Sequence, residues 1–262
     1  MSKIIAISNE KGGVAKTTSA ISIGAALAEL DLQVLLLDLD PQANLTLSVG
    51  MEPGEAKRST TEILIDAAPL QDSYLATEVK NLSIIPADSR IETAEQFLPL
   101  RTNYATSLRR AFESADLSQF HYILMDCPPA LGAITLNALS AADLMIIPTQ
   151  AEYFAAYALR NMMTMVRQVR LDGNPDLSYR ILVTMMDRRN RTHWNIYDQL
   201  RITFGDGVLT TVIELDTQLQ ESPIAGVPIT VYGTGTRGAM QYRVLAQELV
   251  EHAKESESRQ PA

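Results

Sequence analysis

The sequence predicts an α/β protein with a mainly parallel, twisted sheet that carries helices on both faces. Three observations lead to this fold class. Short apolar runs alternate with segments of helical periodicity along the 262-residue chain, which is the pattern of a parallel sheet. A glycine-containing loop separates the first apolar run from the first helical segment, and acidic residues follow two later runs. No repeat or linker interrupts the pattern, so we expect one domain over residues 1–252 and a polar, disordered tail at 253–262.

The expected elements follow in order. The apolar runs at 4–7 and 33–37 predict buried strands, and residues 19–30 between them predict a helix. Ser59 or Thr60 is expected to cap a short helix, because Glu62 stands near its start. Further strands are expected at 82–86, 121–126, 144–148, 179–185 and 208–213. Further helices are expected at 60–67, 91–100, 104–115, 131–142, 155–169, 192–204 and 237–252.

The loop at residues 8–18 reads Ser-Asn-Glu-Lys-Gly-Gly-Val-Ala-Lys-Thr-Thr. Consecutive glycines let backbone N–H groups surround an anion, and the following helix adds its unpaired N–H groups. Lys16 can then reach the β- and γ-phosphates of a nucleotide, and the Thr17 hydroxyl can complete a Mg²⁺ shell. The alternative is an ordinary turn that needs glycine. The strand before and the helix after the loop favour a phosphate loop, and with it a P-loop NTPase-type fold. Its expected nucleotide-binding residues are Lys11, Gly12, Gly13, Val14, Ala15, Lys16, Thr17 and Thr18.

Carboxylates follow two of the expected strands. Asp38-Leu39-Asp40-Pro41-Gln42 comes after the second strand, and Asp126 ends the strand before Cys127-Pro128-Pro129. Ligands of α/β sheets bind at the carboxyl ends of the strands, so these segments are expected beside the phosphate loop. A solvated turn is the alternative for residues 38–42. The three motifs together predict a site for ATP and Mg²⁺.

Residues 11–18 have the form Lys-Gly-Gly-x-x-Lys-Thr-Thr, which resembles the deviant Walker A box of the ParA/MinD family, and the two acidic segments resemble that family as well. The likeness is closest to small, Soj-like ParA proteins and covers most of the chain. It includes the Tyr-Gly-Thr-Gly-Thr-Arg-Gly stretch at 232–238 and Tyr242. The chain departs from the family at Ala15, where a glycine is usual.

The resemblance implies roles for particular residues. Two chains of the family enclose two ATP molecules, and the signature lysine, here Lys11, crosses to the partner's phosphates. Lys11, Lys16 and Asp40 would thus be catalytic, with Asp40 orienting the attacking water. Pro41 and Gln42 would join the nucleotide site. The metal would be held by Thr17, Asp40 and Asp126, with Asp126 acting through water.

The net charge of −9 argues against DNA binding by the whole surface. Residues 160–201 nevertheless contain eight arginines and four acids, for a net charge of +4. ATP-bound dimers of the ParA family bind DNA without regard to sequence, whereas a merely solvated surface is the alternative here. Glu214 and Asp216 stand where many relatives carry basic residues. The candidate DNA-binding residues are Arg188, Arg189 and Arg191, supported by Arg160, Arg167, Arg170 and Arg201.

By resemblance, the function is that of a ParA-type ATPase. It would position or segregate a plasmid, a chromosome or another cargo together with a ParB-like or cargo-adaptor protein that stimulates slow ATP hydrolysis. A protein cargo, such as a carboxysome-like body or a chemoreceptor cluster, is an alternative. A MinD-like membrane ATPase would need an amphipathic basic C-terminal helix, which residues 252–258 do not offer. A relative of the nitrogenase iron protein would need cluster cysteines. A biosynthetic ligase on the same fold would need a small-molecule pocket.

The expected location is the cytoplasm, with nucleoid association in the ATP-bound state. The N-terminus enters the first expected strand at once, and no apolar run approaches the roughly 20 residues of a membrane span, so no membrane partner is expected. Cys127 is the one cysteine, which excludes an intrachain disulfide. It is expected to be a small buried hydrophobe rather than a nucleophile.

Overall fold

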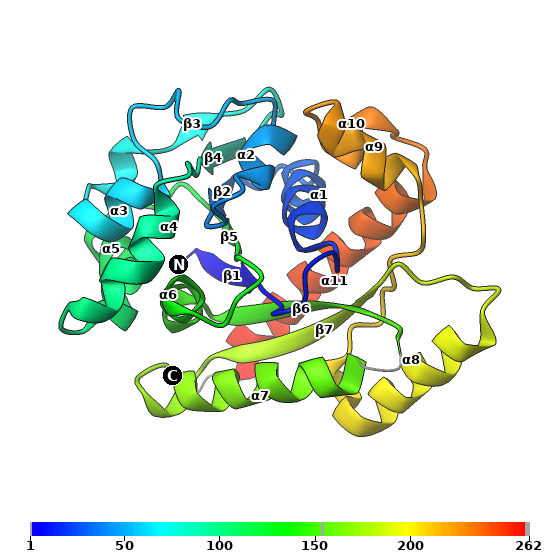
Figure 1. The fold of residues 1–262 in the computed structure, drawn as a ribbon. Helices are drawn as coiled ribbons and strands as arrows, with labels where there is room; N and C mark the ends of the chain where they lie inside the picture. The colour runs from blue at the N-terminus through cyan, green and yellow to red at the C-terminus, as the bar shows by residue number, and fades with distance from the viewer. Residues whose placement is uncertain (1, 153–154, 260–262) are drawn as a thin grey trace.

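The computed structural model describes residues 2–152 and 155–259. Its centre is a seven-stranded sheet with the strand order β3-β4-β2-β5-β1-β6-β7. Neighbouring strands are parallel except β3, which runs antiparallel to β4 at the edge (Figure 1). The strands are β1 (Lys3–Ile7), β2 (Val34–Asp38), β3 (Leu75–Ala76), β4 (Leu82–Ile85), β5 (Tyr122–Asp126), β6 (Leu144–Gln150) and β7 (Ser178–Thr184). The predicted α/β fold class is confirmed.

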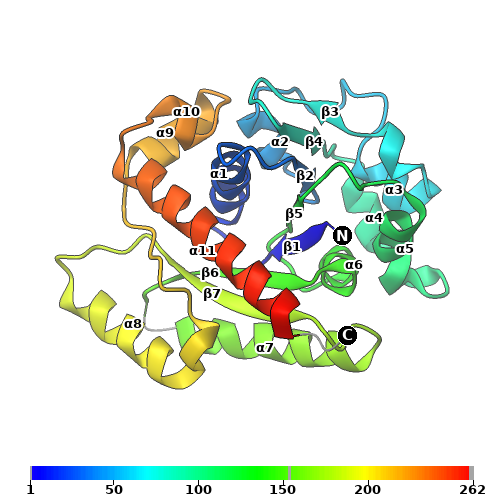
Figure 2. The ribbon, with the colours of Figure 1, turned by 180° about the vertical axis from the view of Figure 1, so that it is seen from behind.

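Helices cover both faces of this sheet (Figures 1 and 2). On one side, α1 (Lys16–Ala28) lies beside the long α11 (Arg237–Arg259). The remaining helices on that side are the short α2 (Asn44–Ser48), α9 (Gln218–Ile224) and α10 (Ile229–Tyr232). The other side carries α3 (Thr60–Asp66), α4 (Ile91–Phe97), α5 (Ser107–Ser114), α6 (Ala133–Ala141), α7 (Ala155–Leu171) and α8 (Arg191–Phe204). Single 3₁₀ turns lie at Leu70–Asp72, Leu98–Leu100, Tyr104–Thr106 and Gly205–Gly207.

Hydrophobic cores lie on both faces of the sheet, and β2 contributes to both. In β2, Leu35 and Leu37 pack on the face of α3 to α8, while Val34 and Leu36 pack on the face of α1 and α11. All four are fully buried, because alternate side chains of a strand point to opposite faces. Both faces of the sheet are therefore shielded from water at β2, as in other parallel sheets.

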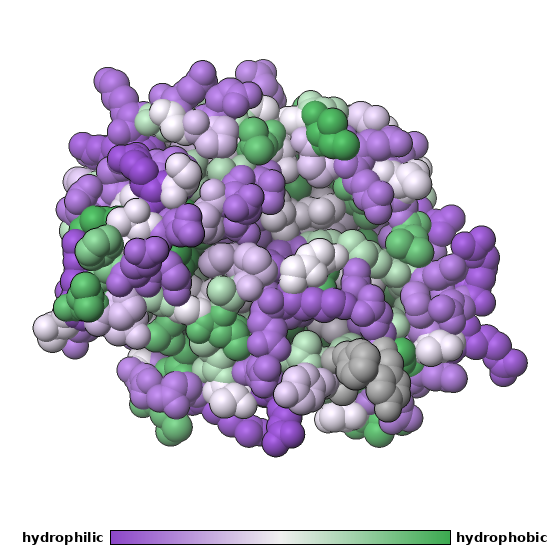
Figure 3. Space-filling model, viewed as in Figure 1, coloured by the Kyte–Doolittle hydropathy of each residue, from purple (hydrophilic) through white to green (hydrophobic). Residues whose placement is uncertain are grey.

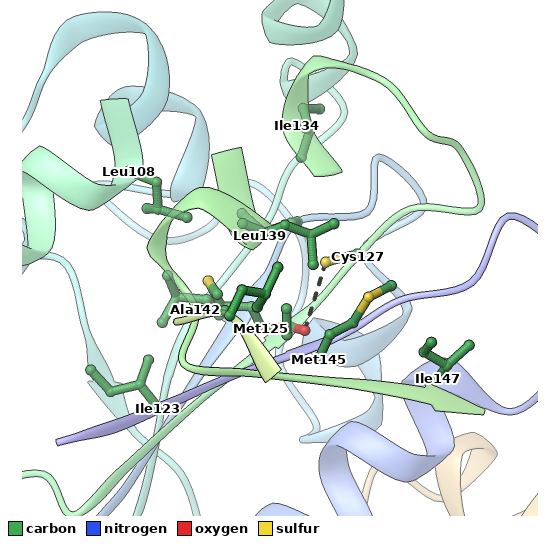
Figure 4. Packing of buried hydrophobic residues seen from close by; sticks show 14 of the residues in the cluster. Leu108, Ile123, Met125, Cys127, Ile134, Leu139, Ala142, Met145 and Ile147 are labelled. Carbon is green, nitrogen blue, oxygen red and sulfur yellow. Dashed lines mark hydrogen bonds between the residues drawn. The ribbon is translucent and has the colours of Figure 1, made fainter. Parts of the chain in front are cut away.

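Cys127 lies in the core on the α6 side (Figure 4). Its side chain is fully buried among apolar residues, and Sγ lies 3.9 Å from the Met125 carbonyl oxygen. Burial raises the pKa of the thiol, which keeps it protonated at neutral pH. The prediction that Cys127 is a buried hydrophobe is confirmed.

The register places the carboxyl ends of three central strands level with one another. Asp126 at the end of β5 pairs with Ile7 on β1 and with Asp38 on β2. The loops that follow β1, β2 and β5 therefore leave the sheet side by side, as the sequence predicted for the phosphate loop and the two acidic segments. This edge of the sheet forms the candidate site.

Two expectations about the elements are wrong. Residues 208–213 form no regular strand beside β7 and make one isolated bridge, from Val208 to Ile181, because the Glu248 carboxylate accepts hydrogen bonds from the Thr210 and Thr211 N–H groups. Those groups are thus diverted from strand pairing. The last helix does not end at His252 but continues to Arg259, so residues 253–259 are helical rather than a disordered tail. Residues 260–262 of that predicted tail lie outside the described residues.

The face seen in Figure 1 is mostly hydrophilic, with smaller apolar areas scattered over it (Figure 3). Within residues 2–152 and 155–259, every helix is too short or too polar to span a lipid bilayer.

Candidate functional site

The loop between β1 and α1 has the backbone of an anion cradle. Gly13 and Ala15 both adopt left-handed conformations, with φ of 72° and 67°. A Cβ on Gly12 or Gly13 would meet no heavy atom within 4 Å, so the space beside these two residues is open. Ala15 immediately precedes α1, and an L-residue with a side chain adopts this backbone at a cost of roughly 1–2 kcal/mol. This backbone is compatible with the predicted phosphate loop and is strained at Ala15.

Lys16 begins α1 and points back across this loop. Only 7% of the residue is exposed, and its Nζ donates a hydrogen bond of 3.1 Å to the Lys11 carbonyl oxygen. Burial lowers the pKa of the ammonium group, while the nearby Asp126 and Asp40 oppose that shift. Lys16 thus stands on the inner side of the loop, where a phosphate group would neutralise it.

Asp126 is fully buried at the end of β5, and neither of its carboxylate oxygens has a hydrogen-bond partner of good geometry among the described residues. Burial is the main cause that raises its pKa well above the usual value, and Asp38 raises it further; Thr17 and Lys16 act in the opposite direction. A buried carboxylate without a hydrogen bond of good geometry is costly. Its arrangement fits a cation bound between Asp126 and the adjacent Thr17, as the sequence predicted.

Asp38 was not among the predicted site residues, although it stands in the Asp-Leu-Asp-Pro-Gln segment. It lies beside Asp126 in the sheet and is fully buried. Its Oδ2 accepts hydrogen bonds from the Thr46 N–H at 2.8 Å and the Thr46 hydroxyl at 2.7 Å. Burial raises the pKa of Asp38 to about 6. Asp38 therefore holds α2 against the site.

Asp40 lies farther out on the same segment and is 7% exposed. Its Oδ1 accepts a hydrogen bond of 2.9 Å from the Gln42 N–H. Pro41 and Gln42 are more exposed. Asp40 is thus close enough to Lys16 to influence its pKa, whereas Asp38 is committed to folding contacts through both oxygens.

These residues fit Mg²⁺ bound together with a nucleotide. Within the described ranges, no group of three or more histidine, cysteine or acidic side chains is arranged to hold a metal ion alone. Mg²⁺ in nucleotide sites typically takes one or two protein ligands, with substrate phosphates and waters completing its octahedron. Thr17 and Asp126 would supply the protein part, and the ion would offset charge on the phosphates.

Unlike Lys16, Lys11 lies at the surface of the molecule. Its Nζ is 2.5 Å from Glu152 Oε2 and 3.0 Å from Gln150 Oε1. The side chain is 43% exposed, so it lies at the molecular surface beside the end of β6. The loop is also tied to β6 and α7, since Asn9 donates to the Pro148 carbonyl oxygen and Asn161 of α7 donates to Glu10. Sequence reasoning found Lys11 but missed these partners, which are far away in the sequence.

The predicted DNA-binding arginines are not equivalent. Arg188 Nε lies 2.7 Å from Glu214 Oε1, and Arg189 is paired with Asp187 through two nitrogens. Arg191, at the start of α8, is exposed, and its side chain has no ion pair within the described part of the chain. The other four candidate arginines also differ from one another in their contacts.

Two of the remaining arginines brace the protein itself. Arg170 donates to the Leu177 carbonyl oxygen, and Arg201 donates to that of Val208. Arg160 and Arg167 are exposed on α7. The structure therefore places these arginines on α7, on α8 and in the loop between β7 and α8, without gathering them into one cluster.

A groove of about 1080 Å³ adjoins Arg188 and Arg189. It lies between α8, residues 210–215 and α11. Glu214 is buried at its base and is held by Arg188, by Arg237 NH1 at 2.7 Å and by Gln241 Nε2 at 2.6 Å. Glu214 thus neutralises two arginines of this surface, and Arg237 is a member that the sequence did not reveal.

The chain is closely similar to several known proteins. A family model described as an AAA domain matches residues 2–179. The sporulation initiation inhibitor protein Soj of Bacillus subtilis is 40% identical over 95% of this chain and 98% of its own length. The chromosome partitioning protein ParA of Caulobacter vibrioides is 36% identical over 98% and 97%, respectively. A crystal structure of cobyrinic acid a,c-diamide synthase from Mycobacterium smegmatis, with bound ADP and magnesium, has a TM-score of 0.85 and 32% identity, covering 98% of this chain and 97% of that one.

Proposed function

This chain belongs to the ParA/MinD family of ATPases, close to the Soj-like partition proteins, and from that premise we propose that it positions or segregates a cargo as an ATP-dependent dimer. Its cofactors are ATP and Mg²⁺. The dimer, its DNA track and its adaptor protein are parts of the proposal.

The observation that carries the proposal is the different placement of two lysines in the phosphate loop. Lys16 is buried on the inner side of the loop, whereas Lys11 lies at the surface with its ammonium group held by Gln150 and Glu152. A lysine that serves only its own chain's phosphates has no reason to lie outside. We infer that Lys11 reaches the phosphates bound by a second copy, where it offsets the charge that develops in the transition state.

The other residues of the site have local roles. Lys16 and the loop N–H groups bind the phosphates. Thr17 and Asp126 hold Mg²⁺, and Asp40 orients the attacking water and influences the metal shell. Pro41 and Gln42 close the site on the side of β2. Hydrolysis is expected to be slow until an adaptor protein contacts the dimer.

The DNA track is proposed from the exposed arginines. Arg191, Arg160 and Arg167 are exposed and free to contact phosphates, and dimerisation would double their number. Arg188 and Arg189 would contribute less because of their acidic partners. Contacts to phosphates carry no sequence information, so binding would be non-specific and sensitive to salt. In the cell, the ATP-bound form would associate with the nucleoid and the released form with the cytoplasm.

A DNA-retention assay tests this proposal. The Asp40→Ala variant, which should bind ATP but hydrolyse it poorly, is applied to immobilised duplex DNA of arbitrary sequence at low ionic strength. The protein that remains on the DNA after washing is then measured. Retention is expected with Mg·ATP, but not with Mg·ADP or without nucleotide. Equal retention under all three conditions, or none under any, would contradict an ATP-gated DNA track.

The likeness to the diamide synthase structure favours a second candidate, an ATP-dependent amide synthesis on a small acid. That reaction needs a pocket for the acid beside the phosphates. The same preparation separates the two functions, since ATP turnover would respond to a carboxylic acid with an amine donor in one case and to DNA with an adaptor protein in the other.

A further inference from the structure

A carboxylate from α4 caps the helix that follows the Asp126 loop. Glu95 Oε1 accepts a hydrogen bond of 2.6 Å from the Ala133 N–H, and Oε2 accepts one of 3.0 Å from the Ile134 N–H. These are the first two N–H groups of α6, which have no partner within the helix. A charged acceptor at a helix N-terminus is also favoured by the helix dipole. Glu95 is 38 residues away from Ala133 in sequence, so the cap is a tertiary contact rather than a local one.

Gly132 leaves the space that this carboxylate occupies. A Cβ at that position would lie 1.7 Å from Glu95 Oε1 and 2.6 Å from its Cδ, and all three of its nearest atoms belong to Glu95. The backbone of Gly132 has φ of −98° and ψ of −161°, an extended conformation open to any residue. Glycine is therefore required here by the Glu95 carboxylate and not by the backbone.

The capped helix anchors one end of the segment that follows the proposed metal ligand, Asp126. Residues 127–132 connect Asp126 to α6. Their near end is fixed where the Cys127 N–H donates to the Ile7 carbonyl oxygen at 3.1 Å. At the far end, the Thr135 hydroxyl donates to the Ala130 carbonyl oxygen at 2.6 Å. Glu95 adds a restraint on this end that comes from outside the segment and its helix.

We propose that Glu95 is a positioning residue for ATP hydrolysis, acting on residues 127–132 through the N-terminus of α6. The inference rests on the proposed ATPase function and adds a residue to it. Glu95 touches neither nucleotide nor metal in this role. Its removal should therefore lower kcat while leaving ATP affinity, which depends on Lys16 and the phosphate loop, nearly unchanged.

The reciprocal geometry of Glu95 and Gly132 provides a double-mutant cycle. In Gly132→Ala, the new methyl group displaces the flexible Glu95 side chain, so this variant should behave like Glu95→Ala. Each is expected to lower kcat by about fivefold, which corresponds to the loss of one helix cap. In the Glu95→Ala background the space is empty, and Gly132→Ala should have no further effect. Additive losses in the double variant would overturn the proposal.

A second readout separates positioning from mere helix stability. Hydrogen exchange of the 127–136 amides in the nucleotide-free protein should quicken in both single variants. As a matched control, Asn190→Ala removes the side-chain cap of α8, where Asn190 Oδ1 accepts from the Thr192 N–H at 3.0 Å, and should leave kcat unchanged. Faster exchange at 127–136 with an unchanged kcat would overturn the positioning role.

The two proposals fail in different ways. If the wild-type protein hydrolyses ATP and both single variants match it, the role of Glu95 is refuted while the ATPase function stands. If the wild type shows no turnover with DNA or any adaptor, the ATPase function fails and the positioning role fails with it, whatever the exchange data show.

Discussion

Lys11 Nζ lies 2.5 Å from Glu152 Oε2, so the first lysine of the phosphate loop is bound to its own chain. Both side chains are about half exposed, at 43% and 51%, and such pairs contribute at most about 1 kcal/mol. The contact is therefore strong enough to direct Lys11 and weak enough to be exchanged for phosphate oxygens of a second molecule. The Lys11–Glu152 ion pair therefore competes with formation of the proposed dimer.

Glu152→Gln is expected to favour dimer formation. Glutamine retains a carbonyl oxygen for Lys11 but removes the charge, so the ammonium group leaves its own chain at lower cost. Because the proposed dimer exchanges two such ion pairs, each worth up to about 1 kcal/mol, ATP-dependent dimer affinity should rise by up to about 25-fold. Analytical ultracentrifugation over a range of protein concentrations measures the change. Weaker dimerisation would mean that Glu152 acts in the dimer and not against it.

Ala15→Gly is expected to relieve backbone strain in the phosphate loop. Ala15 has φ of 67° and ψ of 37°, which glycine adopts without penalty. The free energy of unfolding should rise by about 1 kcal/mol, with ATP affinity unchanged or higher. Ala28→Gly is the matched control, because it places glycine in right-handed helical backbone and should destabilise the protein. A loss of stability in Ala15→Gly would contradict the strain.

The strand–loop–helix pattern made this loop predictable, because its signals are local. Apolar runs, glycines and strand-terminal acids lie within a few residues of one another, and the register at Ile7, Asp38 and Asp126 then follows from parallel strand pairing. The left-handed Ala15 was not predictable, since alanine gives no sign of such a backbone. The sequence showed that Ala15 replaces the family's usual glycine, but it did not show that Ala15 has a left-handed backbone.

Asp126→Asn is expected to stabilise the nucleotide-free protein increasingly as pH rises. Burial raises the pKa of Asp126 in the folded state above its unfolded value. Wild-type stability therefore falls as pH rises from about 4 through that raised pKa, because the folded state must give up a proton that it holds more tightly. The asparagine of the variant carries no such proton, so the variant avoids this decrease in stability.

Denaturant unfolding of the two proteins at pH 5 and pH 8, without Mg²⁺, measures this difference. The advantage of the variant should be on the order of 1 kcal/mol or more at pH 8 and smaller at pH 5. Mg·ATP should reverse the order, since only the wild type retains the metal ligand. A stability advantage that shrinks as pH rises would contradict the burial of an unpartnered carboxylate.

Arg191→Ala is expected to weaken DNA retention more than Arg188→Ala. The Arg191 side chain is exposed and has no acidic partner among the described residues, whereas Arg188 is already neutralised by Glu214. Removing one arginine that binds a DNA phosphate should reduce the slope of log affinity against log salt by about 1. Retention on duplex DNA over a salt series gives both slopes. Equal slopes for the two variants would show that the Glu214 pair opens on DNA.

Glu214→Gln is the complementary variant. It keeps a hydrogen-bonding oxygen for Arg237 and Gln241 but removes the charge that neutralises two arginines. DNA retention should therefore increase and become steeper in salt, while ATP binding should not change. Unaltered retention would place the groove outside the DNA contact.

The interactions that the sequence could not reveal join residues far apart in the chain. Glu152 meets Lys11, Glu214 meets Arg188 and Arg237, and Glu95 meets Gly132, yet no local pattern marks these pairs. The same holds for Glu248, whose carboxylate diverts Thr210 from the predicted strand. Periodicity reports which residues are buried, whereas the partner of a charged side chain depends on the finished packing.

The proposed function depends above all on ATP joining two copies of this chain through Lys11. Sedimentation velocity of Asp40→Ala at a fixed concentration, with Mg·ATP and with Mg·ADP, examines this dimer without interference from hydrolysis. We expect a dimer with Mg·ATP, a monomer with Mg·ADP, and a monomer under both conditions when Lys11→Ala is added to Asp40→Ala. An Asp40→Ala protein that binds ATP yet remains a monomer, or a dimer that persists without Lys11, would contradict the proposed ATP-dependent dimer.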